Sequence, residues 1–181
     1  MKLLDRILQN WRIAKAKPFI PNEAEVLDIG CFDGALFEKL NKKLTFGVGI
    51  DPLVQPKLTD KYRLINGYFP DGLNKYSQFH AITLLAVLEH IPSDIIDNFA
   101  LSCYQYLYPK GKLIITVPHK NVDRILEILL KLKLIHGMSL EEHHGFDINN
   151  TPQIFEKAGL KLIHKSTFQL GLNNLFVFEK P

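Results

Sequence analysis

The chain has 181 residues, a length typical of one domain, and we expect a single domain over residues 1–181. Hydrophobic residues make up 46% and charged residues 23%, proportions that exclude a disordered chain, a collagen and a disulfide-rich scaffold. The net charge is only +3, with 22 Lys and Arg set among 19 Asp and Glu, which disfavours a nucleic-acid partner.

The cysteines and the apolar runs bear on the compartment. Cys31 and Cys103 stand outside any C-x-x-C or metal-ligand pattern, which indicates a reducing environment and predicts a cytoplasmic location. No apolar run approaches the roughly 20 residues that a membrane-spanning helix needs. The first segment carries charges inside its apolar stretch, unlike a signal peptide. We therefore expect neither export nor a transmembrane segment.

The predicted elements begin with a helix within residues 1–20. Its apolar residues recur at helical spacing with charged residues between them, which predicts a surface helix with one apolar stripe. Pro18 and Pro21 are expected to end it. A short apolar run over 25–29 then predicts the first strand, which ends at Gly30.

Alternation of helices and strands continues through the middle of the chain. Asp33 is the expected N-cap of a helix that runs to Leu40, and a second helix is expected to open at Pro92 and Ser93. A turn at 109–111 should follow that helix. The apolar runs predict buried parallel strands at 44–50, 62–65, 79–85 and 113–117. This order implies right-handed crossovers and a doubly wound α/β sheet.

The last third has a different pattern. Residues 121–135 predict a helix that is apolar almost all round, so another part of the chain, a ligand or a second subunit must cover it. We expect 121–145 to be an insertion on the substrate side of the domain. Residues 151–158 predict a helix that Gly159 closes, and two strands joined at Gly171, over 160–168 and 173–179, predict a C-terminal antiparallel hairpin.

The stretch V-L-D-I-G-C-F-D-G, residues 26–34, ends the first strand and opens the first crossover helix. A glycine turn there lets a ligand approach the backbone, and the helix N-terminus supplies free N–H groups. A dinucleotide fingerprint, G-x-G-x-x-G, would need glycine at Phe32 and Ala35. A pyrophosphate site, and with it a nicotinamide-dependent dehydrogenase, is therefore disfavoured.

The spacing D-x-G-x-x-x-G, with Asp28, Gly30 and Gly34, resembles motif I of the class I S-adenosylmethionine-dependent methyltransferases, in particular the small type 11/12-like ones. Phe32 departs from the pattern, since the family usually has glycine there. The resemblance implies a Rossmann-like, mostly parallel, seven-stranded sheet and S-adenosylmethionine as cofactor. Two further stretches match in order: the F-H-A-I and A-V-L-E-H segments of residues 79–90, and L-Y-P-K-G-K-L-I-I-T-V-P of residues 107–118.

The resemblance also assigns cofactor-binding residues. The family's acidic residue after strand two, which binds both ribose hydroxyls, falls on Asp51, and a carboxylate suits a vicinal diol because each oxygen accepts one O–H. After strand three the family has Gly-Asp where this chain has Gly67-Tyr68, so aromatic packing would have to hold the adenine. The other cofactor candidates are Cys31, Pro52, Phe69, Leu85 and Ala86.

For the reaction, the resemblance implies methyl transfer to a small-molecule acceptor, with O-methylation favoured. The sulfonium methyl carbon is already electrophilic, so the enzyme mainly aligns a nucleophile and excludes water. Candidate bases are His90, His119 and His143, although each could simply be a solvated loop residue. A metal site built from Glu89 and these histidines is disfavoured, because Ala86 stands where metal-dependent relatives have another glutamate.

A second hypothesis assigns the chain to another class of protein. The departures at Phe32 and Tyr68 fit a non-catalytic partner subunit that keeps the fold without productive cofactor binding. A homodimer is also left open, because a second subunit could cover the apolar helix expected at 121–135.

Overall fold

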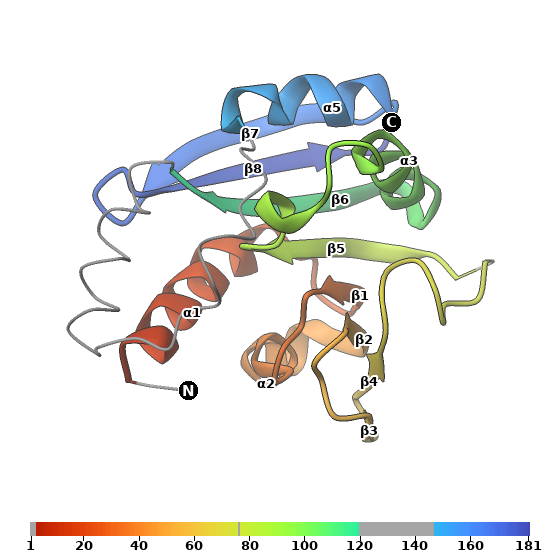
Figure 1. Ribbon diagram of the computed structural model, residues 1–181. Coiled ribbons are helices and arrows are strands. Elements are labelled where there is room, and N and C mark those ends of the chain that lie inside the picture. Colours follow the sequence, from red (N-terminus) through yellow and green to blue (C-terminus); the bar gives the residue numbers. More distant parts are fainter. Residues whose placement is uncertain (1–2, 76, 120–146) are drawn as a thin grey trace.

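The computed structural model describes residues 3–75, 77–119 and 147–181. The described strands form a sheet in the order β3-β4-β2-β1-β5-β6-β8-β7 (Figure 1). The pairs β4–β2, β2–β1, β1–β5 and β5–β6 are parallel, whereas β8 runs antiparallel to both β6 and β7. These pairings confirm the doubly wound, mostly parallel sheet and the C-terminal antiparallel hairpin.

The described elements have the following bounds. The strands are β1 (Ala24–Ile29), β2 (Leu44–Asp51), β3 (Lys57–Leu58), β4 (Tyr62–Asn66), β5 (Phe79–Leu85), β6 (Leu107–Pro118), β7 (Lys161–Phe168) and β8 (Asn173–Glu179). The α-helices are α1 (Leu3–Ala16), α2 (Ala35–Leu40), α3 (Ile96–Gln105) and α5 (Thr151–Lys157). Short 3-10 turns are η1 (Lys17–Phe19), η2 (Asn41–Lys43), η3 (Leu88–His90) and η5 (Ile148–Asn150).

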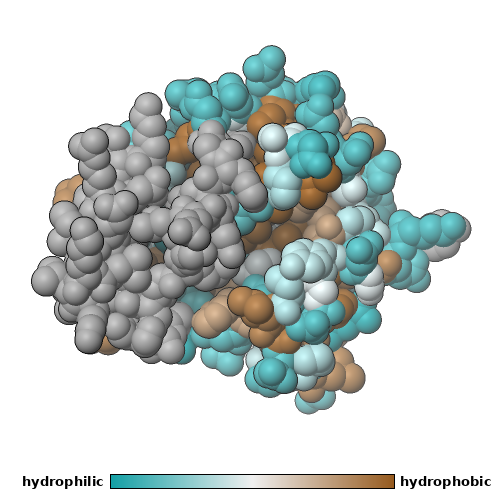
Figure 2. Space-filling model, viewed as in Figure 1, coloured by the Kyte–Doolittle hydropathy of each residue, from teal (hydrophilic) through white to brown (hydrophobic). Residues whose placement is uncertain are grey.

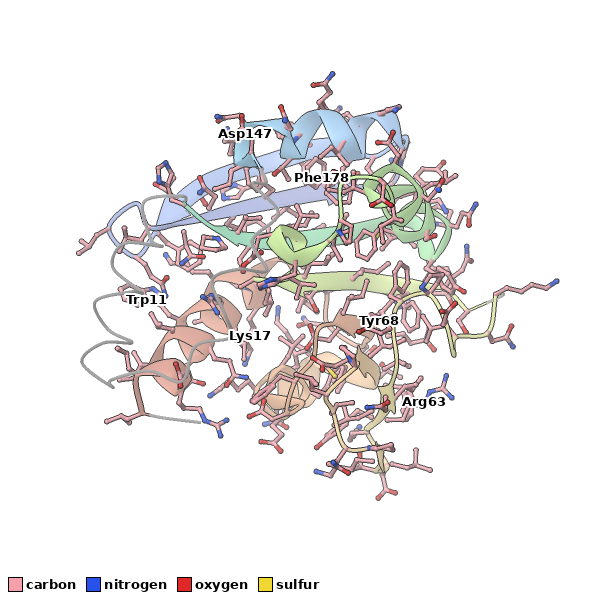
Figure 3. All side chains as sticks on the ribbon, in the orientation of Figure 1. Trp11, Lys17, Arg63, Tyr68, Asp147 and Phe178 are labelled. Carbon is pink, nitrogen blue, oxygen red and sulfur yellow. The ribbon has the colours of Figure 1, made fainter. Side chains whose placement is uncertain are left out.

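Helices cover both faces of the sheet, with α3 and α5 on one side and α1 and α2 on the other (Figure 1). Successive side chains of a strand point to opposite faces. Leu27 therefore packs into the core beneath α3 and α5, and its neighbour Val26 packs into the core beneath α1 and α2. Phe178 of β8 is fully buried in the first of these cores (Figure 3). Apolar residues on both faces explain why the central strands read as continuous apolar runs.

Two strand predictions need correction. Eight strands are described, not seven, because exposed Lys57 and Leu58 form a short antiparallel edge on β4. The turn expected at 109–111 lies inside β6, where Lys110 adopts a positive φ of 65°. Lys110 N–H donates to the carbonyl of Lys180, and Lys180 N–H donates to the carbonyl of Gly111. The end of the chain thus pairs with this part of β6, a long-range contact that local turn residues do not reveal.

The predicted helices also differ in detail. Helix α3 begins at Ile96 and not at Pro92 or Ser93, which lie in a preceding turn. In α1 the buried residues are Ile13 and Ala16, whereas Leu3, Ile7 and Trp11 of the predicted apolar stripe are exposed. The insertion expected at 121–145 and its helix at 121–135 lie outside the described residues. In the part of the chain that the structure describes, no helix is long and apolar enough to cross a membrane.

Candidate active site at the carboxyl edge of the sheet

The site candidates lie where parallel strands end. After β1 the chain adds β2 and β4 toward one edge of the sheet. It then returns past β1 and adds β5 and β6 toward the other edge. Ligands of open α/β sheets bind at such a switch point, outside the carboxyl ends of the strands. In Figure 1 the carboxyl end of β5 points to the left, toward α1. On the face shown in Figure 2, hydrophobic side chains gather in the centre and hydrophilic ones surround them above and to the right.

The turn after β1 has an unusual backbone. Gly30 and Gly34 both have φ of 74°, and Phe32 between them has φ of 49°, which is uncommon for a residue other than glycine. Gly30 N–H donates to the carbonyl of Ile50 at 2.8 Å, which ties the turn to β2. A Cβ on Gly30 would lie 2.3 Å from Cγ2 of Val87, so the turn also packs closely against the loop after β5. The predicted glycine turn is therefore present, and Phe32 takes the conformation that a glycine would.

Asp51 joins this turn to the end of β2. Its Oδ2 accepts a hydrogen bond from Phe32 N–H at 3.0 Å, and its Oδ1 accepts one from Leu53 N–H at 2.8 Å. The residue is buried, with 8% of its surface exposed. A carboxylate has about four lone-pair positions, so each oxygen can accept one more donor. Asp51 is thus oriented by two backbone groups and retains the capacity to bind two hydroxyls.

Asp28, in β1 just before the turn, is buried. Thr83 Oγ1 donates to Asp28 Oδ1 at 2.6 Å from the neighbouring strand β5. The pKa of Asp28 is raised to about 7, mainly because burial disfavours the charged form. The hydrogen bond from Thr83 lowers this pKa, and the negative charges of Asp51 and Asp33 raise it. Asp28 therefore stabilises the start of the turn from inside the protein and is not exposed at the surface.

The two aromatic candidates after β4, Tyr68 and Phe69, lie in different environments. Tyr68 is 71% exposed, whereas the ring of Phe69 packs edge-on against Phe99 and Tyr106, with centroids 5.3 and 5.5 Å away. Gly67 N–H donates to the carbonyl of Asp51, which places the start of this segment beside the end of β2. Of the two aromatic candidates, Tyr68, labelled in Figure 3, is therefore the more exposed.

Two further candidates are Cys31, which is part of the glycine turn, and Pro52, which directly follows β2. Pro52 is exposed, and its carbonyl accepts a hydrogen bond from the Asn66 side chain at 2.8 Å, which fixes the loop after β2. Cys31 is buried, and burial raises the pKa of its thiol, followed by the effect of nearby Asp28. A neutral Cys31 thiol is a packing residue and not a nucleophile.

The ends of β5 and β6 carry the catalytic candidates. Ala86 has φ of 62°, and its N–H donates to the carbonyl of Thr116; Leu85 before it is half-buried. His90 follows in η3, and His119 comes directly after β6, where its N–H donates to the carbonyl of Leu172. His90 and His119 are thus brought to the same edge of the sheet as the glycine turn. His143 lies outside the described residues.

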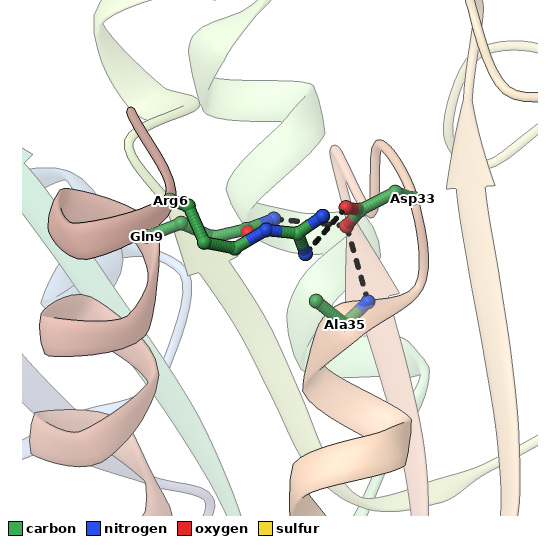
Figure 4. A network of polar contacts seen from close by, with 4 residues as sticks. All are labelled: Arg6, Gln9, Asp33 and Ala35. Carbon is green, nitrogen blue, oxygen red and sulfur yellow. Dashed lines mark hydrogen bonds and ion pairs between the residues drawn. The ribbon is translucent and has the colours of Figure 1, made fainter. Parts of the chain in front are cut away.

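Helix α1 makes contacts with this edge that the sequence did not indicate. Asp33, the expected N-cap, precedes the actual N-cap Gly34 and accepts hydrogen bonds from Arg6 and Gln9 of α1 (Figure 4). Near the other end of α1, burial lowers the pKa of Arg12, while the charge of buried Glu89 raises it. Only a contact between segments far apart in sequence reveals these roles.

A metal centre gains no support from the described side chains. Within 3–75, 77–119 and 147–181, no three His, Cys, Asp or Glu residues come together in a group that could hold a metal ion. Both cysteines are buried and unpaired.

Comparisons with known proteins identify the family. A family model for a methyltransferase domain matches residues 2–165. Ubiquinone biosynthesis O-methyltransferase from Rattus norvegicus mitochondria is 30% identical over 156 residues, which make up 76% of this chain. That alignment spans only 44% of the rat protein, less than half of its length.

Solved structures of similar shape show the same fold. Burkholderia thailandensis 1,6-didemethyltoxoflavin N1-methyltransferase, crystallised with 1,6-didemethyltoxoflavin and S-adenosylhomocysteine, has a TM-score of 0.72 at 14% identity. The alignment covers 96% of this chain and 78% of that one. The Haloferax volcanii complex of the Trm112 methyltransferase activator and a methyltransferase gives 0.71 at 15% identity, with 98% and 92% covered. The family match extends over most of the chain, so this protein belongs to the methyltransferase domain family, which confirms the resemblance to class I methyltransferases and their cofactor class, S-adenosylmethionine.

Proposed function

We propose that this protein transfers a methyl group from S-adenosylmethionine to a small organic acceptor, with an oxygen atom as the favoured nucleophile. The observation that carries the proposal is the 3.0 Å hydrogen bond from Phe32 N–H to Asp51 Oδ2. It joins the glycine turn after β1 to the carboxylate at the end of β2, at the switch point of the sheet. A nucleoside ligand needs both, one for close backbone approach and one for its ribose hydroxyls.

The chain's own residues fit the cofactor. Asp51 would accept the two ribose hydroxyls, and the turn from Gly30 to Gly34 would allow the ligand to approach its backbone. Tyr68 is preferred to Phe69 for contact with the adenine, because the Phe69 ring already packs on Phe99 and Tyr106. When bound, the cofactor supplies an electrophilic methyl group on a sulfonium centre.

The remaining task of the protein is to hold a nucleophile in line and exclude water. His90 and His119 stand at the ends of β5 and β6, on the side of the sheet where an acceptor would meet the cofactor. Either could take the proton of an acceptor hydroxyl. His143 remains a third candidate from the sequence.

The small-molecule, oxygen-directed acceptor rests on two observations. The rat relative is named as an O-methyltransferase of ubiquinone biosynthesis, at 30% identity over part of its length. The net charge of +3 offers little electrostatic attraction for a nucleic acid. A cytoplasmic location and a homodimer stay predictions from the sequence.

The first experiment is calorimetry of the full chain with S-adenosylhomocysteine, followed by a methyl-transfer assay with labelled cofactor and a panel of phenols and carboxylic acids. Saturable binding with one site per chain is expected. No heat of binding at millimolar ligand would overturn the proposal. In the assay, His90→Ala or His119→Ala should slow turnover while leaving S-adenosylhomocysteine affinity unchanged; equal rates for both variants and the wild type would remove the histidines from the mechanism.

A further inference from the structure

One carboxylate connects helix α1 to the glycine turn. Arg6 Nη1 donates to Asp33 Oδ2 at 3.0 Å, and Gln9 Nε2 donates to Asp33 Oδ1 at 2.9 Å (Figure 4). Asp33 Oδ1 also accepts Ala35 N–H at 3.2 Å, at the start of α2. Asp33 therefore binds together α1, the turn and the first residue of α2.

The turn is held from two sides. Phe32 has φ of 49°, a left-handed conformation that costs a residue with a Cβ roughly 1–2 kcal/mol. From the β2 side, Asp51 accepts the Phe32 N–H. From the α1 side, Arg6 and Gln9 hold Asp33, the next residue along. A strained backbone conformation persists when surrounding contacts fix it. Here the carboxylates of Asp51 and Asp33 fix the conformation of Phe32.

We propose that Asp33 is a positioning residue through which α1 favours the ligand-binding shape of the glycine turn, so that docking of α1 and cofactor binding strengthen each other. The inference rests on the proposed function, because it takes the S-adenosyl group as the ligand of the turn. Such coupling is reciprocal: the factor by which α1 contacts improve cofactor affinity is the factor by which the cofactor stabilises those contacts.

The same helix reaches the acceptor side of the site. Helix α1 also packs against β5 and β6, the strands that precede His90 and His119. Helix α1 thus spans the interval between the cofactor turn and these strands. A helix that contacts both can transmit the state of one to the other.

The test is calorimetry of S-adenosylhomocysteine binding to the Arg6→Ala/Gln9→Ala double variant. These residues lie on α1 and leave the turn's own sequence unchanged. The dissociation constant should rise about three- to tenfold, because one bond is an exposed ion pair and the other a partly buried neutral donor on a carboxylate. Arg6→Lys should retain near wild-type affinity in an otherwise unchanged chain. Asp97→Asn is the matched control, because it breaks the Lys157–Asp97 ion pair between α3 and α5, away from the site.

Trp11 provides a second readout, because it is the only tryptophan of the chain and lies on α1 (Figure 3). Its fluorescence should change on addition of S-adenosylhomocysteine to the wild type, and the change should shrink in the double variant. Wild-type affinity in the double variant, an equal loss in Asp97→Asn, or the same Trp11 response in the wild type and the double variant would each overturn the inference. Absence of binding to the wild type would instead overturn the proposed function.

Discussion

Thr83 and Asp28 are joined by a 2.6 Å hydrogen bond between adjacent buried positions of β5 and β1. Burial dominates this site and raises the pKa of Asp28 to about 7. An exposed aspartate titrates near pH 3.9. The first residue of the D-x-G-x-x-x-G motif is therefore a carboxyl group, in β1 just before the cofactor turn, that changes charge close to neutral pH.

The raised pKa predicts how stability depends on pH. In the unfolded chain Asp28 loses its proton near pH 4, whereas in the folded protein it keeps the proton up to about pH 7. The folded state then binds more protons, so Asp28 makes its full contribution below pH 4 and loses it as the pH rises to about 7. The free energy of unfolding should fall across this window by at most about 1.4 kcal/mol per pH unit.

Urea unfolding of Asp28→Asn between pH 4 and 8 measures this contribution. Asparagine is neutral throughout and can still accept the Thr83 hydroxyl, so the variant should show a flatter profile and match or exceed the wild type at pH 8. Asp60→Asn, at an exposed position, should keep the wild-type slope. Identical slopes in wild type and Asp28→Asn would show that Asp28 does not titrate in this window.

The sequence predicted what depends on local pattern. The apolar runs marked the central strands because both faces of the sheet are covered, and the glycine and aspartate positions marked the edge where β1 and β2 end. Residues whose roles come from distant contacts were not predicted. Asp33 was expected to be the N-cap of α2, but Gly34 takes that position, and Asp33 accepts hydrogen bonds from Arg6 and Gln9 of α1.

The missed β3 and the longer β6 have similar causes. Lys57 and Leu58 carry no apolar alternation, because both side chains are exposed on a sheet edge. Lys110 lies in β6 because its N–H pairs with Lys180 near the far end of the chain. His80 of the F-H-A-I segment has a structural contact: its Nδ1 accepts the backbone N–H of Glu25 near the amino end of β1, away from the site.

Asp51 is expected to contribute strongly to cofactor affinity. Hydrogen bonds to a charged group contribute about 1.5–3 kcal/mol, so Asp51→Asn should weaken S-adenosylhomocysteine binding roughly ten- to hundredfold. Calorimetry measures the affinity, and thermal unfolding without ligand measures the separate cost of weakening the bonds from Phe32 and Leu53. Unchanged affinity in a folded variant would reject the ribose role, and Asp60→Asn again serves as the control.

Phe32 tests the alternative of a non-catalytic partner subunit. Its φ of 49° already lies in the left-handed region that favours glycine, and 49% of the residue is exposed. Phe32→Gly should therefore bind S-adenosylhomocysteine within about threefold of the wild type. Phe32→Val should lose roughly 1–2 kcal/mol of unfolding free energy, because a β-branched residue tolerates this φ poorly. A tenfold or greater gain in the affinity of Phe32→Gly for S-adenosylhomocysteine would show that the phenyl ring obstructs the site. That result would favour the hypothesis of a non-catalytic partner subunit.

Gly30 is required both by its φ and by its closeness to Val87. Gly30→Ala places a Cβ 2.3 Å from Val87 Cγ2 in addition to the strain of a left-handed alanine, and it should lower the unfolding free energy by about 2–4 kcal/mol. Gly171→Ala is the matched control. Its φ is 82°, similar to that of Gly30, but nothing lies within 4 Å of the added Cβ, so it should show the strain alone.

A second substitution, at Val87, separates the steric clash from the backbone strain in Gly30→Ala. Val87→Ala in the Gly30→Ala background removes the Cγ2 atom, and the combined variant should recover to about the level of Gly171→Ala, as measured by urea unfolding. If Val87→Ala gives the same loss of stability in both backgrounds, the two residues are not coupled, and the clash with Val87 Cγ2 does not explain the loss in Gly30→Ala. Recovery would instead show that the clash with Val87 accounts for the part of the loss that Gly171→Ala does not share.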